Sequence, residues 1–149
     1  MATQTQNQGN FSILPILKKI PLFANLNEKE HADIVSHIEL QFYPKNYVIF
    51  HEGDIGEAVY IIKTGLVQVF KGEGETRKNF AALGEGDFFG EMALMSDEVR
   101  SASVETVEDS EIFVLKKADF FELVQKSPDM ASHLSEECLK RMKENKMKN

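Results

Sequence analysis

The sequence predicts a mainly β domain with helices on both flanks, and two observations support this. Eight of the nine glycines lie in one stretch, at positions 53, 56, 65, 72, 74, 84, 86 and 90, whereas the four prolines all lie outside it. Between those glycines the chain carries short segments rich in β-branched and aromatic residues. Short strands separated by regularly spaced turns are typical of a sandwich or a barrel.

A helix is expected before the first strand. Asn27 precedes two acidic residues and an apolar pattern at Ile34, Val35 and Ile38. A capping side chain, acidic residues in the first turn and one apolar stripe favour a helix start at this point. The strands that we expect after it are residues 47–50, 58–63, 66–70, 79–83, 101–107 and 111–115.

Two helices are expected after the last strand. Residues 118–126 contain Phe120 and Phe121, which we expect to be buried, and Ser127 with Pro128 has the composition of a helix N-cap and first turn. In the final helix, apolar residues recur every four positions: Met130, Leu134, Cys138 and Met142. This stripe predicts core packing, and a lid over a ligand or the seam of a homodimer are the alternatives.

Length and charge limit the function classes. With 149 residues, of which 42% are hydrophobic, the chain can form one core, so we expect a polar flexible arm at residues 1–10 and a single domain at residues 11–149. The net charge of -7 disfavours nonspecific binding to nucleic acid or to an anionic membrane surface.

The cellular location that we expect is the cytoplasm. Cys138 is the only cysteine, so it has no partner for an internal disulfide. The first ten residues lack the basic start and apolar run of a secretory signal, and no apolar run in the middle of the chain is long enough to cross a bilayer. The sequence therefore predicts a soluble protein without membrane insertion.

One passage carries a specific motif. Residues 84–106 read GEGDFFGEMALMSDEVRSASVET, in which FGEMAL (89–94) is followed by RSA (100–102). This passage resembles the phosphate-binding cassette of the cyclic-nucleotide-binding domain family, with its F-G-E-x-A-L and R-[ST]-A patterns. A second stretch, Gly53, Asp54 and Gly56 followed by YII (60–62) and Gly65, is similar to the G-D-x-G…YII…G hairpin of the same family. The resemblance runs from about Phe11 to Lys146.

The resemblance, which is to the catabolite-regulator and kinase-regulatory-subunit type, implies a fold and a site. The implied fold is a β jelly-roll barrel (a double-stranded β-helix) with N-terminal helices and two C-terminal helices. The implied cassette residues are Gly90, Glu91, Met92, Ala93, Leu94, Arg100, Ser101 and Ala102. The implied apolar wall is Val69, Phe80 and Leu83, and the implied lid residues on the final helix are Arg141, Met142 and Asn145.

The residue types also fit the chemistry of a cyclic phosphate. The guanidinium of Arg100 can meet two phosphate oxygens with paired, charge-assisted hydrogen bonds. Gly90 would let a ligand approach the backbone N–H groups at the start of a short helix. Glu91 would repel a phosphate, so a ribose hydroxyl, which can donate to a carboxylate, is its expected partner.

The identity of the nucleotide stays open between cAMP and cGMP, and a cyclic dinucleotide is a further alternative. The hydroxyl of Ser101 can reach a phosphate or a guanine edge. The chain departs from the family pattern at Val99, where proline is frequent, and at Asn46, where glycine is frequent. Asparagine tolerates the left-handed conformation better than most residues, so neither departure argues against binding.

The function that we expect is a stand-alone cyclic-nucleotide sensor that changes its C-terminal helical surface when it binds cAMP or cGMP. The alternative is an interaction or dimerisation module that binds no ligand. An enzyme is not expected, because His31, His37, His51 and His133 lack the H-x-H spacing of metal-dependent β-barrel oxygenases. No cofactor, no metal and no direct nucleic acid contact are expected. We expect the chain to bind a protein partner, whose identity the sequence does not indicate, and a homodimer is a further possibility.

Overall fold

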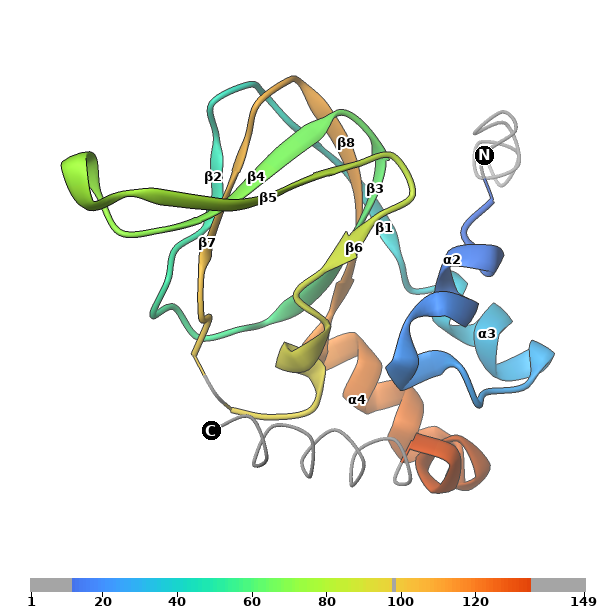
Figure 1. The fold of residues 1–149 in the computed structure, drawn as a ribbon. Helices are drawn as coiled ribbons and strands as arrows, with labels where there is room; N and C mark the ends of the chain where they lie inside the picture. Colours follow the sequence, from blue (N-terminus) through green and yellow to red (C-terminus); the bar gives the residue numbers. More distant parts are fainter. Residues whose placement is uncertain (1–11, 98, 135–149) are drawn as a thin grey trace.

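Two four-stranded sheets face each other, and helices pack against one of them (Figure 1). The computed structural model describes residues 12–97 and 99–134. The first sheet has the order β1 (Glu39–Tyr43), β8 (Ser110–Lys116), β3 (Ala58–Thr64) and β6 (Phe88–Phe89). The second has the order β2 (Val48–Phe50), β7 (Ser103–Thr106), β4 (Leu66–Lys71) and β5 (Lys78–Gly84). The predicted class, mainly β with flanking helices, is confirmed.

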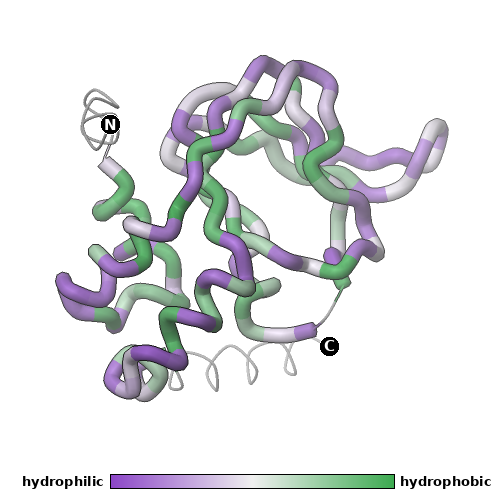
Figure 2. Tube along the Cα trace, turned by 180° about the vertical axis from the view of Figure 1, so that it is seen from behind, coloured by the Kyte–Doolittle hydropathy of each residue, from purple (hydrophilic) through white to green (hydrophobic). Residues whose placement is uncertain are grey.

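The helices lie at one end and side of the barrel. They are α2 (Leu14–Lys19), the 3₁₀ turn η1 (Pro21–Phe23), α3 (Glu28–Val35) and α4 (Lys117–Lys126), and residues 128–134 are also helical. Their buried side chains form one core cluster with the outer face of β3 and β8, and a second cluster fills the space between the sheets. In Figure 2 hydrophobic stretches follow the strands and the adjoining helices, whereas the projecting β4–β5 hairpin is mostly purple and white.

The predicted cap of α3 is confirmed in detail. The side chain of Asn27 accepts a hydrogen bond from the backbone N–H of Glu30 at 2.9 Å, and the Glu30 carboxylate accepts one from the backbone N–H of Asn27 at 2.8 Å. This reciprocal pair is a capping box, which satisfies donors that the helix itself leaves without acceptors. The Glu30 carboxylate also contacts Nδ1 of His133 at 3.0 Å, so the cap joins α3 to the helical segment 128–134.

Substituting alanine for Asn27 is therefore expected to lower the free energy of unfolding by about 1 kcal/mol, because the cap is lost and the Glu30 amide is left without its acceptor. Chemical denaturation measures this difference. Lys29→Ala is the matched control on the same helix, since its side chain is 83% exposed and forms only a surface ion pair with Asp33. An equal loss in both variants would contradict the role of the cap.

Two strands and one side-chain position differ from the sequence prediction. β1 was not predicted because it lies before Pro44, outside the glycine-rich stretch from which the strands were predicted. β6 has only two residues, too few for a recognisable alternation. Phe120 is buried as expected, but Phe121 is 47% exposed, because successive residues of α4 face different directions. The six predicted strands correspond to β2, β3, β4, β5, β7 and β8, with ends that differ by one or two residues.

The C-terminal part agrees with the prediction as far as it is described. The Ser127 hydroxyl accepts a hydrogen bond from the backbone N–H of Met130 at 3.3 Å, as expected of a helix cap. Met130 and Leu134 are buried in the helical core cluster, so this half of the apolar stripe packs within the domain. Cys138, Met142 and the arm at residues 1–10 lie outside the described residues.

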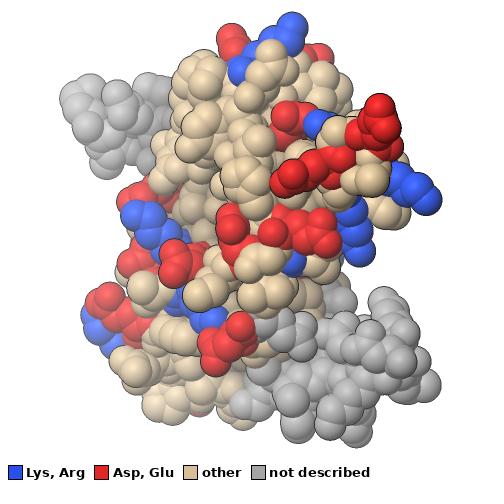
Figure 3. Space-filling model, turned by 90° about the vertical axis from the view of Figure 1, so that its left-hand side faces the viewer, with Lys and Arg blue, Asp and Glu red and all other residues tan. Residues whose placement is uncertain are grey.

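The surface carries mixed charge. On the face drawn in Figure 3, acidic and basic side chains are interspersed, and no continuous basic surface is visible there among the residues that are coloured. None of the helices in the described ranges is both long and apolar enough to cross a bilayer.

Candidate functional site

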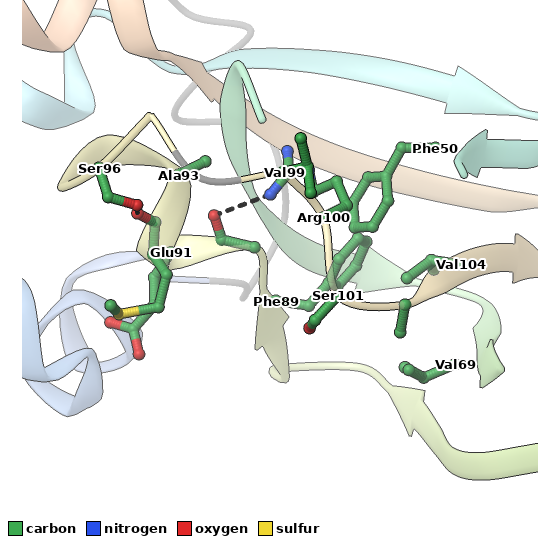
Figure 4. A pocket seen from close by; sticks show the side chains of 13 residues that line it. Phe50, Val69, Phe89, Glu91, Ala93, Ser96, Val99, Arg100, Ser101 and Val104 are labelled. Carbon is green, nitrogen blue, oxygen red and sulfur yellow. Dashed lines mark hydrogen bonds between the residues drawn. The ribbon is translucent and has the colours of Figure 1, made fainter. Parts of the chain in front are cut away.

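A cavity of about 450 Å³ opens between the second sheet and the turn that follows β6. Its lining is formed by Phe50, Val69, Phe89, Gly90, Glu91, Met92, Ala93, Ser96, Val99, Arg100, Ser101, Ala102 and Val104. Figure 4 shows that the two ends of this cavity differ in the residues that line them. Glu91, Ala93 and Ser96 lie at one end, Val69 and Val104 at the other, and Arg100 lies between them.

A glycine turn starts the polar end of the cavity. Gly90 has φ +83°, in the left-handed region, and caps the 3₁₀ helix η3 (Glu91–Leu94). This conformation lets the chain turn sharply from β6 into η3, and glycine adopts it without steric cost. A Cβ atom at this position would lie 2.8 Å from Nη1 of Arg100 and 3.2 Å from the carbonyl oxygen of Ala58. The turn therefore requires glycine for conformation and for space.

Arg100 is the buried cation of the cavity. Its residue is 8% exposed, Nη1 donates to the carbonyl oxygen of Gly90 at 3.1 Å, and Nη2 donates to that of Ala58 at 2.8 Å. Its Nε is buried and has no acceptor among the described residues. Burial lowers the pKa of the guanidinium, whereas Tyr60, Asp54 and Glu57 oppose this change. The site thus holds a desolvated positive charge whose hydrogen-bonding capacity the protein satisfies only in part.

The G-D-x-G stretch fixes the backbone of this arginine. The backbone N–H of Gly53 donates to the carbonyl oxygen of Arg100 at 2.8 Å, and the N–H of Arg100 donates to that of Asp54 at 2.7 Å. The Asp54 carboxylate accepts a hydrogen bond from the N–H of His51 at 2.9 Å, which closes the turn. A Cβ on Gly56 would lie 3.2 Å from Cζ of Arg100 and 2.6 Å from Cβ of Ala93. The two motifs of the sequence therefore form one structural unit.

Three aromatic rings lie on the other side of Arg100. Cζ of Arg100 lies 4.0 Å from the ring centroid of Phe50 and 5.8 Å from that of Tyr60. Tyr60 stacks on Phe89 with a centroid distance of 4.9 Å and an interplanar angle of 9°. All three rings belong to or pack against the core between the sheets, so Arg100 lies at the edge of that core.

Tyr60 reports on the charge of Arg100. Burial raises the pKa of the Tyr60 hydroxyl, and the neighbouring Arg100 lowers it. We expect Arg100→Gln to raise the pKa of Tyr60 further, because the cation that favours tyrosinate is removed. The folded protein holds the proton of Tyr60 more strongly than the unfolded chain does. The stability that this residue contributes is therefore present below the pKa of tyrosine in the unfolded chain, and it is lost as the pH rises through the pKa in the folded protein.

The measurement is an alkaline titration followed by the ultraviolet absorbance of tyrosinate, with Tyr60→Phe to identify the contribution of this residue. An unchanged Tyr60 transition in Arg100→Gln would contradict the described proximity of the two groups.

The family model of the cyclic nucleotide-binding domain matches residues 40–127, more than half of the chain and the whole of the site. The chain belongs to this family. It is 35% identical over 129 residues to the cyclic AMP receptor protein of Thermus thermophilus, covering 86% of this chain and 60% of that protein. It is 34% identical over 129 residues to a cGMP-dependent protein kinase of Caenorhabditis briggsae, covering 83% of this chain and 17% of the kinase. The chain thus spans less than two thirds of each of these relatives.

A solved structure agrees in fold. The regulatory domain of Toxoplasma gondii PKA, crystallised with cAMP, superposes with a TM-score of 0.69 at 26% identity, covering 80% of this chain and 44% of that chain. The jelly-roll arrangement that the resemblance implied is therefore confirmed.

This cyclic nucleotide-binding domain brings most of the predicted site residues to the cavity. Those that line it are Val69, Gly90, Glu91, Met92, Ala93, Arg100, Ser101 and Ala102. Leu94 does not line it: this side chain is 2% exposed and belongs to the helical core cluster with Phe120. Leu83 packs against the core between the sheets. Arg141, Met142 and Asn145 lie outside the described residues.

Phe80 is the predicted wall residue that the structure places elsewhere. It is 59% exposed and does not line the cavity. The reason is the alternation of side chains along β5: Leu83 faces the core between the sheets, so Phe80, three positions away, faces the opposite side. Phe80 also has no partner on β4, because Val69 pairs with Ala81 and Phe70 pairs with Asn79, which is a β-bulge.

Sequence reasoning did not assign five lining residues of this domain: Phe50, Phe89, Ser96, Val99 and Val104. Phe89 and Val99 stand beside assigned cassette residues, so their positions in the motif were a usable signal. Phe50 and Val104 reach the cavity through strand pairing, because Phe50 pairs with Val104 and Val104 pairs with Val69. One further expectation concerns the backbone. Asn46 has φ +67°, in the left-handed region, as expected of a position where the family often has glycine.

No group of His, Cys, Asp and Glu side chains suited to hold a metal ion occurs in the described part of the domain.

Proposed function

We propose that this domain binds cAMP or cGMP and that Arg100 holds the ring phosphate. The observation that carries the proposal is the state of the guanidinium: it lies in the cavity, it is buried, and its Nε has no acceptor among the described residues. An anion that reached this side chain would supply an acceptor and a compensating charge. Charge-assisted hydrogen bonds of this kind are about twice as strong as neutral ones.

The two ends of the cavity suit the two ends of a nucleotide. Val69 and Val104 offer an apolar surface for a purine base, on the side of Arg100 away from η3. Glu91, at the opposite end, is proposed as the acceptor for a ribose hydroxyl. Ser101 is exposed at the cavity and is proposed as a further donor to the phosphate or to a guanine edge. Catalysis is not part of the proposal, because binding accounts for all these groups.

A route from the site to the helices supports a sensor role. Leu94, at the end of η3, is buried in the same cluster as Phe120 of α4. Nζ of Lys117, at the start of α4, donates to the carbonyl oxygen of Ser96 at 2.8 Å and contacts the carboxylate of Asp97 at 3.1 Å. A ligand that moved η3 or the loop after it would therefore move α4. We propose that the changed helical surface is the output, read in the cytoplasm by a protein partner or a second copy of the chain.

The test is a titration of the purified protein with cAMP, with cGMP and with a cyclic dinucleotide, followed by calorimetry and by backbone amide spectra. We expect saturable binding of one cyclic mononucleotide with shifts at residues 90–94 and at the start of α4. Binding with no shift in α4 would support a binding domain and reject the sensor. If millimolar nucleotide produced neither heat nor shifts, the proposal would be wrong and an interaction module without ligand would replace it.

A further inference from the structure

The ring of Phe50 faces the guanidinium of Arg100. The distance from Cζ to the ring centroid is 4.0 Å, well within the range of about 6 Å over which a ring face attracts a cation. Both residues line the cavity, and Figure 4 shows the ring beside the arginine. Phe50 therefore contacts the cation of the site directly.

Neighbouring rings and strand pairing hold Phe50 in this orientation. Its ring centroid lies 5.7 Å from that of Tyr60 and 6.0 Å from that of Phe89, both in tilted arrangements. Phe50 ends β2, where its pairing with Val104 fixes the backbone. Aromatic pairs at such distances are favourable, so the ring face stays directed at the arginine.

Together with two carbonyl groups, the ring defines the position of the guanidinium. The carbonyl oxygens of Gly90 and Ala58 fix the two terminal nitrogens, and the Phe50 ring lies 4.0 Å from the central carbon of the guanidinium. Nε is the nitrogen with no acceptor in the described ranges. Little freedom remains for the side chain to leave the cavity.

We infer that Phe50 is a positioning residue for phosphate recognition: it holds the Arg100 guanidinium by a cation–π contact in the place where the ring phosphate binds. The inference rests on the proposed function and deepens it. It assigns to Phe50 a contribution that acts through the arginine and not through the base. Loss of the aromatic face should then weaken only the binding of ligands that carry the phosphate.

The first measurement compares Phe50→Leu with Phe80→Leu. We expect Phe50→Leu to weaken cyclic nucleotide binding about tenfold, the size of a desolvated cation–π contact. Phe80 is the matched control, because its ring also has a cation nearby, with Nζ of Lys71 at 5.5 Å, but is exposed and lies outside the cavity. Phe80→Leu should bind as the parent does, and Phe50→Tyr should restore binding.

The second measurement separates positioning from packing. In an Arg100→Ala background, Phe50→Leu should cause no further loss, because the group through which it acts is absent. Adenosine, which has the base and ribose without the phosphate, should bind equally well to the parent and to Phe50→Leu. Incorporation of fluorinated phenylalanine at this position keeps the shape of the ring and weakens its attraction for cations, so it tests the contact even if Phe50→Leu is poorly folded.

Each outcome decides between explanations. Additive losses in the double variant, equal losses for adenosine, or unchanged affinity with the fluorinated ring would overturn the inference and make Phe50 a wall residue. The proposed function would survive all three results. If the parent protein bound neither cAMP nor cGMP, the proposed function would fail first and the role of Phe50 in binding would fail with it.

Discussion

Arg100→Ala is expected to weaken cyclic nucleotide binding about a hundredfold, a loss of roughly 2 to 4 kcal/mol for a charged hydrogen-bonding partner in a partly dry site. The phosphate would enter the cavity without its cation, and the carbonyl groups of Gly90 and Ala58, which accept from the guanidinium, would face it instead. The measurement is calorimetric titration of parent and variant with the nucleotide that binds the parent. Thermal melting of both proteins checks that the variant is folded.

Arg77→Ala is the control for this substitution. Like Arg100, Arg77 contacts an aromatic ring, with 3.8 Å from Cζ to the Phe70 centroid, and its Nη2 forms an ion pair with the Glu105 carboxylate at 2.7 Å. It does not line the cavity. We expect this variant to lose some stability and to keep its affinity. Equal affinities of Arg100→Ala and the parent would reject the assigned role of Arg100.

Gly90→Ala is expected to have the second largest effect, on both stability and binding. A non-glycine residue at φ +83° carries backbone strain of about 1 to 3 kcal/mol. In addition, the new methyl group would lie 2.8 Å from Nη1 of Arg100, so the guanidinium would have to move. We expect a lower melting temperature and a loss of affinity of about tenfold or more, because misplacement of a charged hydrogen bond forfeits much of its value.

Gly86→Ala separates the two causes. Gly86 has nearly the same φ, +84°, but no atom lies within 4 Å of a Cβ built on it. This variant should therefore be destabilised by backbone strain alone and should bind like the parent. Similar affinity losses in both variants would show that strain in the fold, and not the approach to Arg100, explains the effect.

The sequence allowed the fold class to be predicted because turn and strand signals are local. Glycines mark the turns, and β-branched residues mark β3, β4 and β8. The strand β1 was missed because it precedes Pro44 and no glycine turn marks its start, so it lies outside the stretch where these signals occur. Phe80 was assigned to the wall from the family pattern, although the alternation of a strand places it and Leu83 on opposite faces.

The sequence predicted those residues of the site that lie next to one another in the cassette. The cassette residues from Gly90 to Ala93 and from Arg100 to Ala102 line the cavity. Phe50 was not predictable, because it reaches Arg100 only through the pairing of β2 with β7. Leu94 was assigned to the ligand by family pattern, yet its side chain lies in the helical core, because successive residues of the 3₁₀ helix η3 point in different directions.

The strand order also has a consequence for synthesis. β8 lies between β1 and β3, and β7 lies between β2 and β4, so an inner strand of each sheet comes from the last third of the chain. While the polypeptide emerges from the ribosome, earlier strands have open edges where these two later insert. The second sheet cannot be completed before Thr106 has been synthesised, and the first cannot be completed before Lys116. Long-range pairing of this kind generally slows folding, and strand edges that stay open meanwhile are the sites at which aggregation starts.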